Sequence, residues 1–125
     1  MKENDISDPI LDCCFKVHKN LGPGLFESVF EEILALEMSN KNLHFERQKV
    51  LSLIYGDIKI DAAFRADFIV ENKVIIELKS VEKILPVHKK QLFTYLKITN
   101  CKLGLLINFN TELLKDGIYR VVNNL

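Results

Sequence analysis

The chain is 125 residues long, which is enough for one domain with a hydrophobic core of its own. Apolar residues make up 48% and charged residues 27%, as in ordinary globular domains, and no apolar run approaches the length of a membrane span. The formal net charge is zero, so overall charge alone does not indicate a nucleic-acid partner.

The charges are nevertheless unevenly distributed along the chain. Residues 1–50 carry nine acidic and six basic side chains, whereas residues 73–102 carry seven lysines against only Glu77 and Glu82. This basic segment is compatible with phosphate binding, and equally with a solvated helix face.

The N-terminus and the cysteines bear on the cellular compartment. The first nine residues, MKENDISDP, are polar and lack the apolar core of a signal peptide, so we expect a cytoplasmic protein. Cys13, Cys14 and Cys101 have neither the spacing of a disulfide framework nor that of a metal motif. We expect them to be small buried side chains in a reducing compartment.

The first 40 residues predict two helices. The motif SDP at residues 7–9 is a good helix start, and apolar residues then recur at helical spacing until GPG at 22–24 ends the run. A second helix is predicted over about residues 26–40. Its predicted buried stripe consists of Val29, Ile33 and Leu36.

The middle of the chain changes to the alternating period of strands. Four strands are predicted, at residues 45–55, 58–64, 66–71 and 74–80. Gly56-Asp57 and Asn72-Lys73 are the expected hairpin turns.

The last third of the chain predicts a helix followed by two strands. Pro86 opens the helix, which should run to about Thr99, and an apolar strand at 103–109 and a short strand at 118–122 follow. The predicted order is α-α-β-β-β-β-α-β-β, an α+β or α/β domain with a mixed sheet. The core candidates in the last helix are Val87, Leu92, Tyr95, Leu96 and Ile98.

Two charged residues interrupt the apolar segment VIIELKSV at residues 74–81. Glu77 and Lys79 share one face of the predicted strand, and a turn at 72–73 would bring Asp67 of the preceding strand close to Glu77. Neighbouring carboxylates repel each other unless one is protonated or a cation lies between them, and their oxygens suit Mg²⁺ or Mn²⁺. The spacing therefore predicts a candidate metal site, with an ordinary cross-strand acid–base pair as the alternative.

Two helices carry further candidates for this site. His88, Gln91 and Tyr95 fall on one face of the third helix. Glu27 lies in the first turn of the second helix, where the helix dipole favours a carboxylate, and Glu31 follows four residues later. For Glu27, a capping acid on a solvated face is the alternative to a site residue.

Taken in order, these segments resemble the GxxExxY family, a group of small proteins in the PD-(D/E)xK nuclease superfamily. The resemblance runs from about residue 10 to residue 122. It rests on LGPGLFESVFEE, on FERQ at 45–48, on RADFIVENKVIIELKSV, on the helix with Gln91 and Tyr95, and on GLLINF. It implies a restriction-endonuclease-like core, a mixed sheet flanked by helices, in one domain over residues 1–125.

The resemblance also assigns roles to the candidate residues. The implied metal ligands are Asp67, Glu77 and Glu27. Lys79 would be the motif lysine that stabilises charge on the phosphorus or positions the water, and Gln91 would complete the catalytic set. The resemblance places Tyr95 next to the site, and from the helix register and the lysines of this helix we also expect His88 and Lys89 as substrate contacts.

Two positions depart from the family's pattern. Ala66 stands where a proline usually precedes the metal-binding aspartate. Phe30 stands at the tyrosine that gives the family its name, so any hydroxyl function at that position is lost.

The implied activity is hydrolysis of nucleic-acid phosphodiester bonds, with DNA as the expected substrate and Mg²⁺ or Mn²⁺ as cofactor. Two alternatives stay open, because fold does not entail activity. The first is an inactive nuclease fold that binds nucleic acid, which need not coordinate metal. The second is a protein-interaction module, for instance a homodimer, which a contiguous exposed apolar patch would favour.

Overall fold

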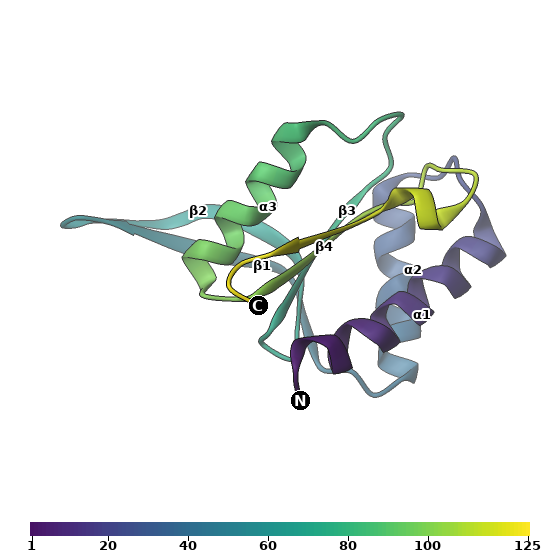
Figure 1. Ribbon diagram of the computed structural model, residues 1–125, viewed down its shortest axis with the longest axis horizontal. Coiled ribbons are helices and arrows are strands. Elements are labelled where there is room, and N and C mark those ends of the chain that lie inside the picture. The colour runs from purple at the N-terminus through teal and green to yellow at the C-terminus, as the bar shows by residue number, and fades with distance from the viewer.

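A five-stranded mixed sheet separates two helical layers in the computed structural model, which describes residues 1–125 (Figure 1). Helices α1 (Glu3–Leu21) and α2 (Glu27–Asn40) cover one face of the sheet, and α3 (Pro86–Thr99) covers the other. None of the helices combines the length and the apolarity needed to cross a membrane.

The strands lie in the sheet in the order in which they occur along the chain. They are β1 (Phe45–Tyr55), β2 (Ile58–Val70), β3 (Val74–Lys79), β4 (Leu103–Asn108) and β5 (Ile118–Val122), and a 3₁₀ turn, η1 (Leu114–Gly117), leads into β5. Only β3 and β4 are parallel, because α3 crosses over between them, whereas the other neighbours pair antiparallel.

The core has two parts, one on each face of the sheet. Every residue of β4 is buried, since the α1–α2 layer covers one side of this strand and α3 covers the other. Close packing of α3 depends on Gly104 in β4. A Cβ atom at this position would lie only 2.8 Å from Cγ of Leu92 in α3.

The β1–β2 hairpin extends beyond the sheet as a two-stranded arm (Figure 1). Strand β2 pairs with β3 only through residues 68–70, and the rest of its length pairs with β1 alone. The turn Gly56-Asp57 closes the arm, as predicted, with Gly56 at a φ of 60°. The point where β2 leaves β3 forms a fork at the base of the arm.

The structure confirms the predicted fold class, and the helices and sheet segments follow in the predicted order. One difference is that the predicted strands at 58–64 and 66–71 form the single strand β2. Arg65, between them, pairs with Val50 of β1, so the ladder continues through the predicted break. The predicted helix Pro86–Thr99 and the last strand at 118–122 are confirmed, and all three cysteines are free and buried.

Helix α1 begins at Glu3, one turn before the predicted start at residues 7–9. Ile6 is fully buried, so the additional turn places apolar surface in the core. The backbone N–H of Lys2 also donates to Asp5 Oδ2 at 3.2 Å, which satisfies a donor at the helix start. The proline of the SDP motif therefore lies inside the helix.

The predicted buried stripe of α2 was wrong at two of its three residues, while the third, Ile33, is half-buried against the core. Val29 and Leu36 are exposed, whereas Phe30 is fully buried and stacks on Phe109 with 4.5 Å between ring centres. The sequence of α2 offers two overlapping apolar stripes, and this aromatic contact selects one of them. The resulting rotation places Glu31 at the border of the buried face. In α3, likewise, Val87 is exposed although it was a core candidate; the buried residues are Leu92, Tyr95 and Leu96.

Candidate functional site

Asp67 and Glu77 face each other at the fork where β2 leaves β3. The backbone N–H of Asp67 donates to Glu77 Oε1 at 3.2 Å, and the backbone N–H of Leu78 donates to Asp67 Oδ2 at 2.8 Å. The regular ladder between β2 and β3 ends at the pair Phe68–Ile76, so Asp67 and Glu77 are the first residues beyond it. Side-chain carboxylates thus accept backbone N–H groups that a regular ladder would pair with carbonyls.

The surroundings of the two carboxylates disfavour negative charge. Burial, together with the neighbouring charge of Asp67, raises the pKa of Glu77 to about 8. Burial also raises the pKa of Asp67, although the hydrogen bond from Leu78 opposes the shift. The positive charge of Lys79 lowers both pKa values but does not cancel the rise. A cation placed between these carboxylates would therefore be strongly favoured.

The donor set fits a hard divalent cation. Asp67 and Glu77 offer carboxylate oxygens, and no group of three His, Cys, Asp or Glu side chains is close enough to surround a metal ion. Mg²⁺ is commonly held by one or two carboxylates, while waters and substrate phosphates complete its octahedron. The pair therefore suits Mg²⁺ or Mn²⁺ better than a metal that needs a closed protein cage.

The structure adds a third carboxylate, Glu31 of α2, that sequence reasoning did not place at the site. The side-chain amide of Gln48 donates to Glu31 Oε1 and, at 3.2 Å, to Asp67 Oδ1. The negative charge of Glu31 also raises the pKa of Asp67. The sequence signal for this contact was Gln48 in the motif FERQ. It could not be recognised, because the predicted buried stripe of α2 gave Glu31 no particular orientation.

Arg47 holds Glu31 from the other side. Its guanidinium Nη2 lies 2.8 Å from Glu31 Oε2 and 2.6 Å from Glu32 Oε1. In the structure it forms an ion pair with two acids of α2.

Glu27 does not contact the other acids. Its side chain is exposed, and it forms no ion pair or side-chain hydrogen bond. The beginning of α2 nevertheless lies beside the end of β3, because the Ser80 hydroxyl donates to the Leu25 carbonyl at 2.6 Å. The role of Glu27 as a metal ligand stays a prediction.

Tyr95 lines the α3 side of the site. It is buried and stacks on Phe64 with 4.4 Å between ring centres. Burial raises its pKa, and so do the negative charges of Glu77 and Asp67, which places the phenol within the field of the carboxylates. Gln91, one turn earlier on the same helix, is exposed.

His88 and Lys89 make contacts away from the carboxylates. Nδ1 of His88 accepts the backbone N–H of Leu85 at 3.0 Å, which caps the start of α3. Nζ of Lys89 lies 4.3 Å from the centre of the Tyr119 ring on β5. The structure thus does not bring these two predicted substrate contacts to the acids.

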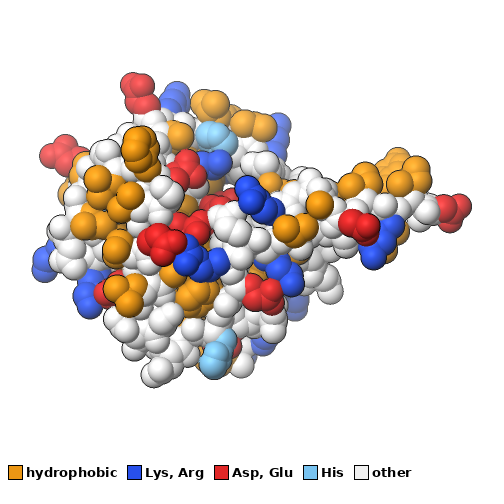
Figure 2. All heavy atoms as spheres, turned by 180° about the vertical axis from the view of Figure 1, so that it is seen from behind, with side chains coloured by type: hydrophobic (Ala, Val, Ile, Leu, Met, Phe, Trp, Pro, Cys, Tyr) orange, Lys and Arg blue, Asp and Glu red, His pale blue; other side chains and the backbone are white.

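An open hollow of about 680 Å³ lies between α2 and the base of the arm. Acidic and basic side chains lie next to each other at the base of the arm (Figure 2). Two of the residues that line the hollow, Glu31 and Gln48, contact each other and connect it to Asp67. Glu31 thus lies at the wall of the hollow, whereas Asp67 and Glu77 are half-buried beside it.

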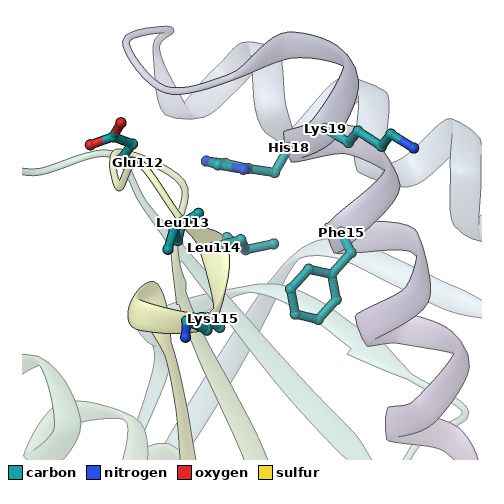
Figure 3. Close-up of a pocket in the computed structure, with 7 residues that line it drawn as sticks. All are labelled: Phe15, His18, Lys19, Glu112, Leu113, Leu114 and Lys115. Carbon is teal, nitrogen blue, oxygen red and sulfur yellow. The ribbon is translucent and has the colours of Figure 1, made fainter.

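A second hollow, of about 350 Å³, lies between α1 and the segment before β5 (Figure 3). Its walls include Phe15, Leu113 and Leu114, and its histidine, His18, already has Nε2 2.7 Å from the Thr111 carbonyl oxygen. It contains none of the carboxylates of the fork. The cluster around Asp67 and Glu77 is therefore the stronger candidate for chemistry.

Comparison with known proteins identifies the family of the chain. No significant match was found among curated proteins or among solved structures. The sequence model of the PD-(D/E)XK nuclease superfamily, however, matches residues 4–121, which is nearly the whole chain and includes every residue of the fork. The chain therefore belongs to the PD-(D/E)XK nuclease superfamily.

Proposed function

We propose that this chain is a metal-dependent nuclease that hydrolyses phosphodiester bonds of nucleic acid, with DNA as the expected substrate, and that residues 1–125 form a single nuclease-like domain. The observation that carries the proposal is the pairing of Asp67 with Glu77 at the fork, with Lys79 two residues further along β3. The chain belongs to a nuclease superfamily, which supports a role of this carboxylate pair in nuclease chemistry.

Asp67 and Glu77 would hold Mg²⁺ or Mn²⁺, with Glu27 as the proposed third acid. When bound, such an ion polarises the phosphate and lowers the pKa of a coordinated water. Residues of the chain orient these metal ligands. The backbone N–H of Leu78 and the side-chain amide of Gln48 both donate to the Asp67 carboxylate and fix its orientation. Buried Glu77 keeps its orientation through the N–H of Asp67.

Lys79 would supply positive charge where negative charge develops on the phosphate. Its positive charge lowers the pKa of both carboxylates, which supports this role. Tyr95 and Phe64 form a stacked apolar wall on the α3 side, which would limit the access of water. Gln91, His88 and Lys89 are proposed as contacts to more distant parts of the substrate.

The exposed lysines of the third helix region would bind the nucleic-acid backbone. They are Lys83, Lys89, Lys90 and Lys97. Contacts of this kind neutralise phosphates without reading bases, so the apparent affinity should fall steeply as salt concentration rises.

Metal binding followed by cleavage tests the proposal. Calorimetry with Mg²⁺ and with Mn²⁺ should detect binding to the wild type and loss of binding in Glu77→Ala. In the same samples, labelled single- and double-stranded DNA, and RNA as a further substrate, should be cut only by the protein that binds metal. Glu82→Ala is the matched control, because Glu82 is an exposed acid that makes no hydrogen bond or ion pair. A wild type that binds neither ion would refute the proposal.

One observation favours a second candidate, a protein-interaction module that forms a homodimer. Leu53 pairs with Ile60 and Tyr55 with Ile58, so these apolar side chains share one face of the arm. Tyr55 is 77% and Ile58 63% exposed, and apolar side chains gather at the tip of the arm (Figure 2). Sedimentation of the wild type against Tyr55→Ser/Ile58→Thr separates the candidates. A dimer that the double variant abolishes, without any metal binding, would favour the interaction module.

We propose the cytoplasm as the compartment. Three free, buried cysteines and the absence of disulfides fit a reducing environment.

A further inference from the structure

Gln48 has a backbone conformation that a strand does not require. Its φ is 50°, in the left-handed region that residues other than glycine rarely adopt. Its neighbours are regular, since Arg47 pairs with Phe68 and Lys49 with Ala66 across the β1–β2 ladder. The strain is therefore confined to one residue inside an otherwise continuous strand.

This conformation lets two consecutive side chains bind the same carboxylate. In a regular strand, residues 47 and 48 would point to opposite faces of the sheet. Here Arg47 donates to Glu31 Oε2 at 2.8 Å, and the amide of Gln48 donates to Glu31 Oε1. Both oxygens of Glu31 are thus engaged by adjacent residues of β1.

The Gln48 amide also acts on Asp67. It donates to Oδ1 at 3.2 Å, while the N–H of Leu78 donates to Oδ2 at 2.8 Å, so both oxygens of Asp67 have donors. Each carboxylate oxygen keeps a second lone pair that stays available to a metal ion. An uncharged NH₂ group with two donors suits this position, because it joins two carboxylates of like charge.

We propose that Gln48 is a positioning residue of the metal site, and that its amide, held at the strained position, fixes the Asp67 carboxylate for metal binding. The inference rests on the proposed function. It goes further in assigning a role to a residue that contacts no metal or substrate itself. Groups that orient a metal ligand commonly change metal affinity 10- to 100-fold when they are removed.

Gln48→Gly tests the proposal, because it keeps the left-handed backbone accessible while it removes the amide. We expect the Kd for Mg²⁺, measured by calorimetry, to rise about 10- to 100-fold, with a melting temperature in EDTA equal to or above that of the wild type. Gln48→Asn is the second variant: asparagine tolerates this conformation but is one methylene too short to reach both acids. It should weaken binding in the same direction.

Asn72→Gly is the matched control. Asn72 has a φ of 56° in the turn before β3, and its side chain makes no hydrogen bond to the carboxylates. Relief of backbone strain there should leave the Kd for Mg²⁺ unchanged.

The outcomes separate the inference from the proposed function. If the wild type binds Mg²⁺ and both Gln48 variants bind it equally well, Gln48 is only structural, while the nuclease proposal stands. If the wild type binds no metal, the proposed function and the role of Gln48 fall together. Weaker binding by the folded Gln48 variants, with an unchanged Asn72 control, would support the inference.

Discussion

The backbone N–H of Asp67 donates to the side chain of Glu77 across the fork, and not to a carbonyl of β3. The two strands separate at this pair, so the carboxylates take over the hydrogen bonds that the ladder gives up. This arrangement explains how a chain can keep two acids inside apolar segments. Each acid satisfies a backbone donor, while the charge of the pair is left for a cation to balance.

Glu77→Gln should stabilise the metal-free protein at neutral pH and abolish metal binding. The amide keeps the shape of the side chain and removes a charge that burial and Asp67 disfavour. Thermal unfolding in EDTA at pH 7.5 should show a higher melting temperature for the variant, whereas calorimetry should show no Mg²⁺ binding. A variant that is less stable than the wild type in EDTA would contradict this account.

The metal-free protein should lose stability as the pH rises. The folded-state pKa of Glu77 is raised from 4.5 to about 8, so its stabilising contribution is complete below pH 4.5 and is lost as the pH rises towards 8. The total effect is on the order of a few kcal/mol. Urea unfolding in EDTA between pH 5 and 8 measures it, and the same series on Glu77→Gln should show a weaker dependence.

Metal binding should release protons below pH 8. Glu77 must lose its proton to become a ligand, and its pKa of about 8 means that it is largely protonated at pH 6 to 7. The affinity for Mg²⁺ should therefore rise up to about tenfold per pH unit until the pH reaches this value. Calorimetry in buffers of different ionisation enthalpy counts the released protons directly. A binding enthalpy that is independent of the buffer at pH 6.5 would refute the assignment of Glu77.

Lys79→Met should reduce the rate of cleavage more than the affinity for metal. The positive charge of Lys79 acts on both carboxylates, and we expect it to act most strongly on charge that develops during hydrolysis. Single-turnover cleavage at saturating Mg²⁺ should slow by about 10²-fold or more. Lys83→Met changes an exposed lysine four residues further along the chain and serves as the control. It should weaken only the salt-sensitive binding of nucleic acid.

Gly104→Ala should destabilise the fold through its contact with α3. The new Cβ would lie 2.8 Å from Leu92 Cγ, and overpacking of this kind costs about 1–3 kcal/mol. Leu92→Ala in the same chain removes the obstructing atoms, so the double variant should be more stable than the sum of the two single effects predicts. Denaturant unfolding of the four proteins of this cycle provides the measurement. Strict additivity would show that the two residues do not compete for space.

Much of the fold follows from local patterns in the sequence. The apolar run of β4 predicts a strand covered on both faces, Gly56-Asp57 predicts the tip of the arm, and Pro86 predicts the start of α3. These features depend on backbone preferences and on the period of apolar residues, which a short segment expresses by itself. The pairing of Asp67 with Glu77 was likewise predictable, because a tight turn fixes the register of the hairpin.

Other features depend on contacts between distant segments. The stacking of Phe30 on Phe109 decides which face of α2 is buried, and this choice turns Glu31 towards the fork. The left-handed conformation of Gln48 has no local signature, since only its bonds to Glu31 and Asp67 account for it. The fold class and the pair of carboxylates could thus be predicted from local patterns. The further side chains that hold these acids could not, because packing between elements sets the rotation of α2 and the backbone strain at Gln48.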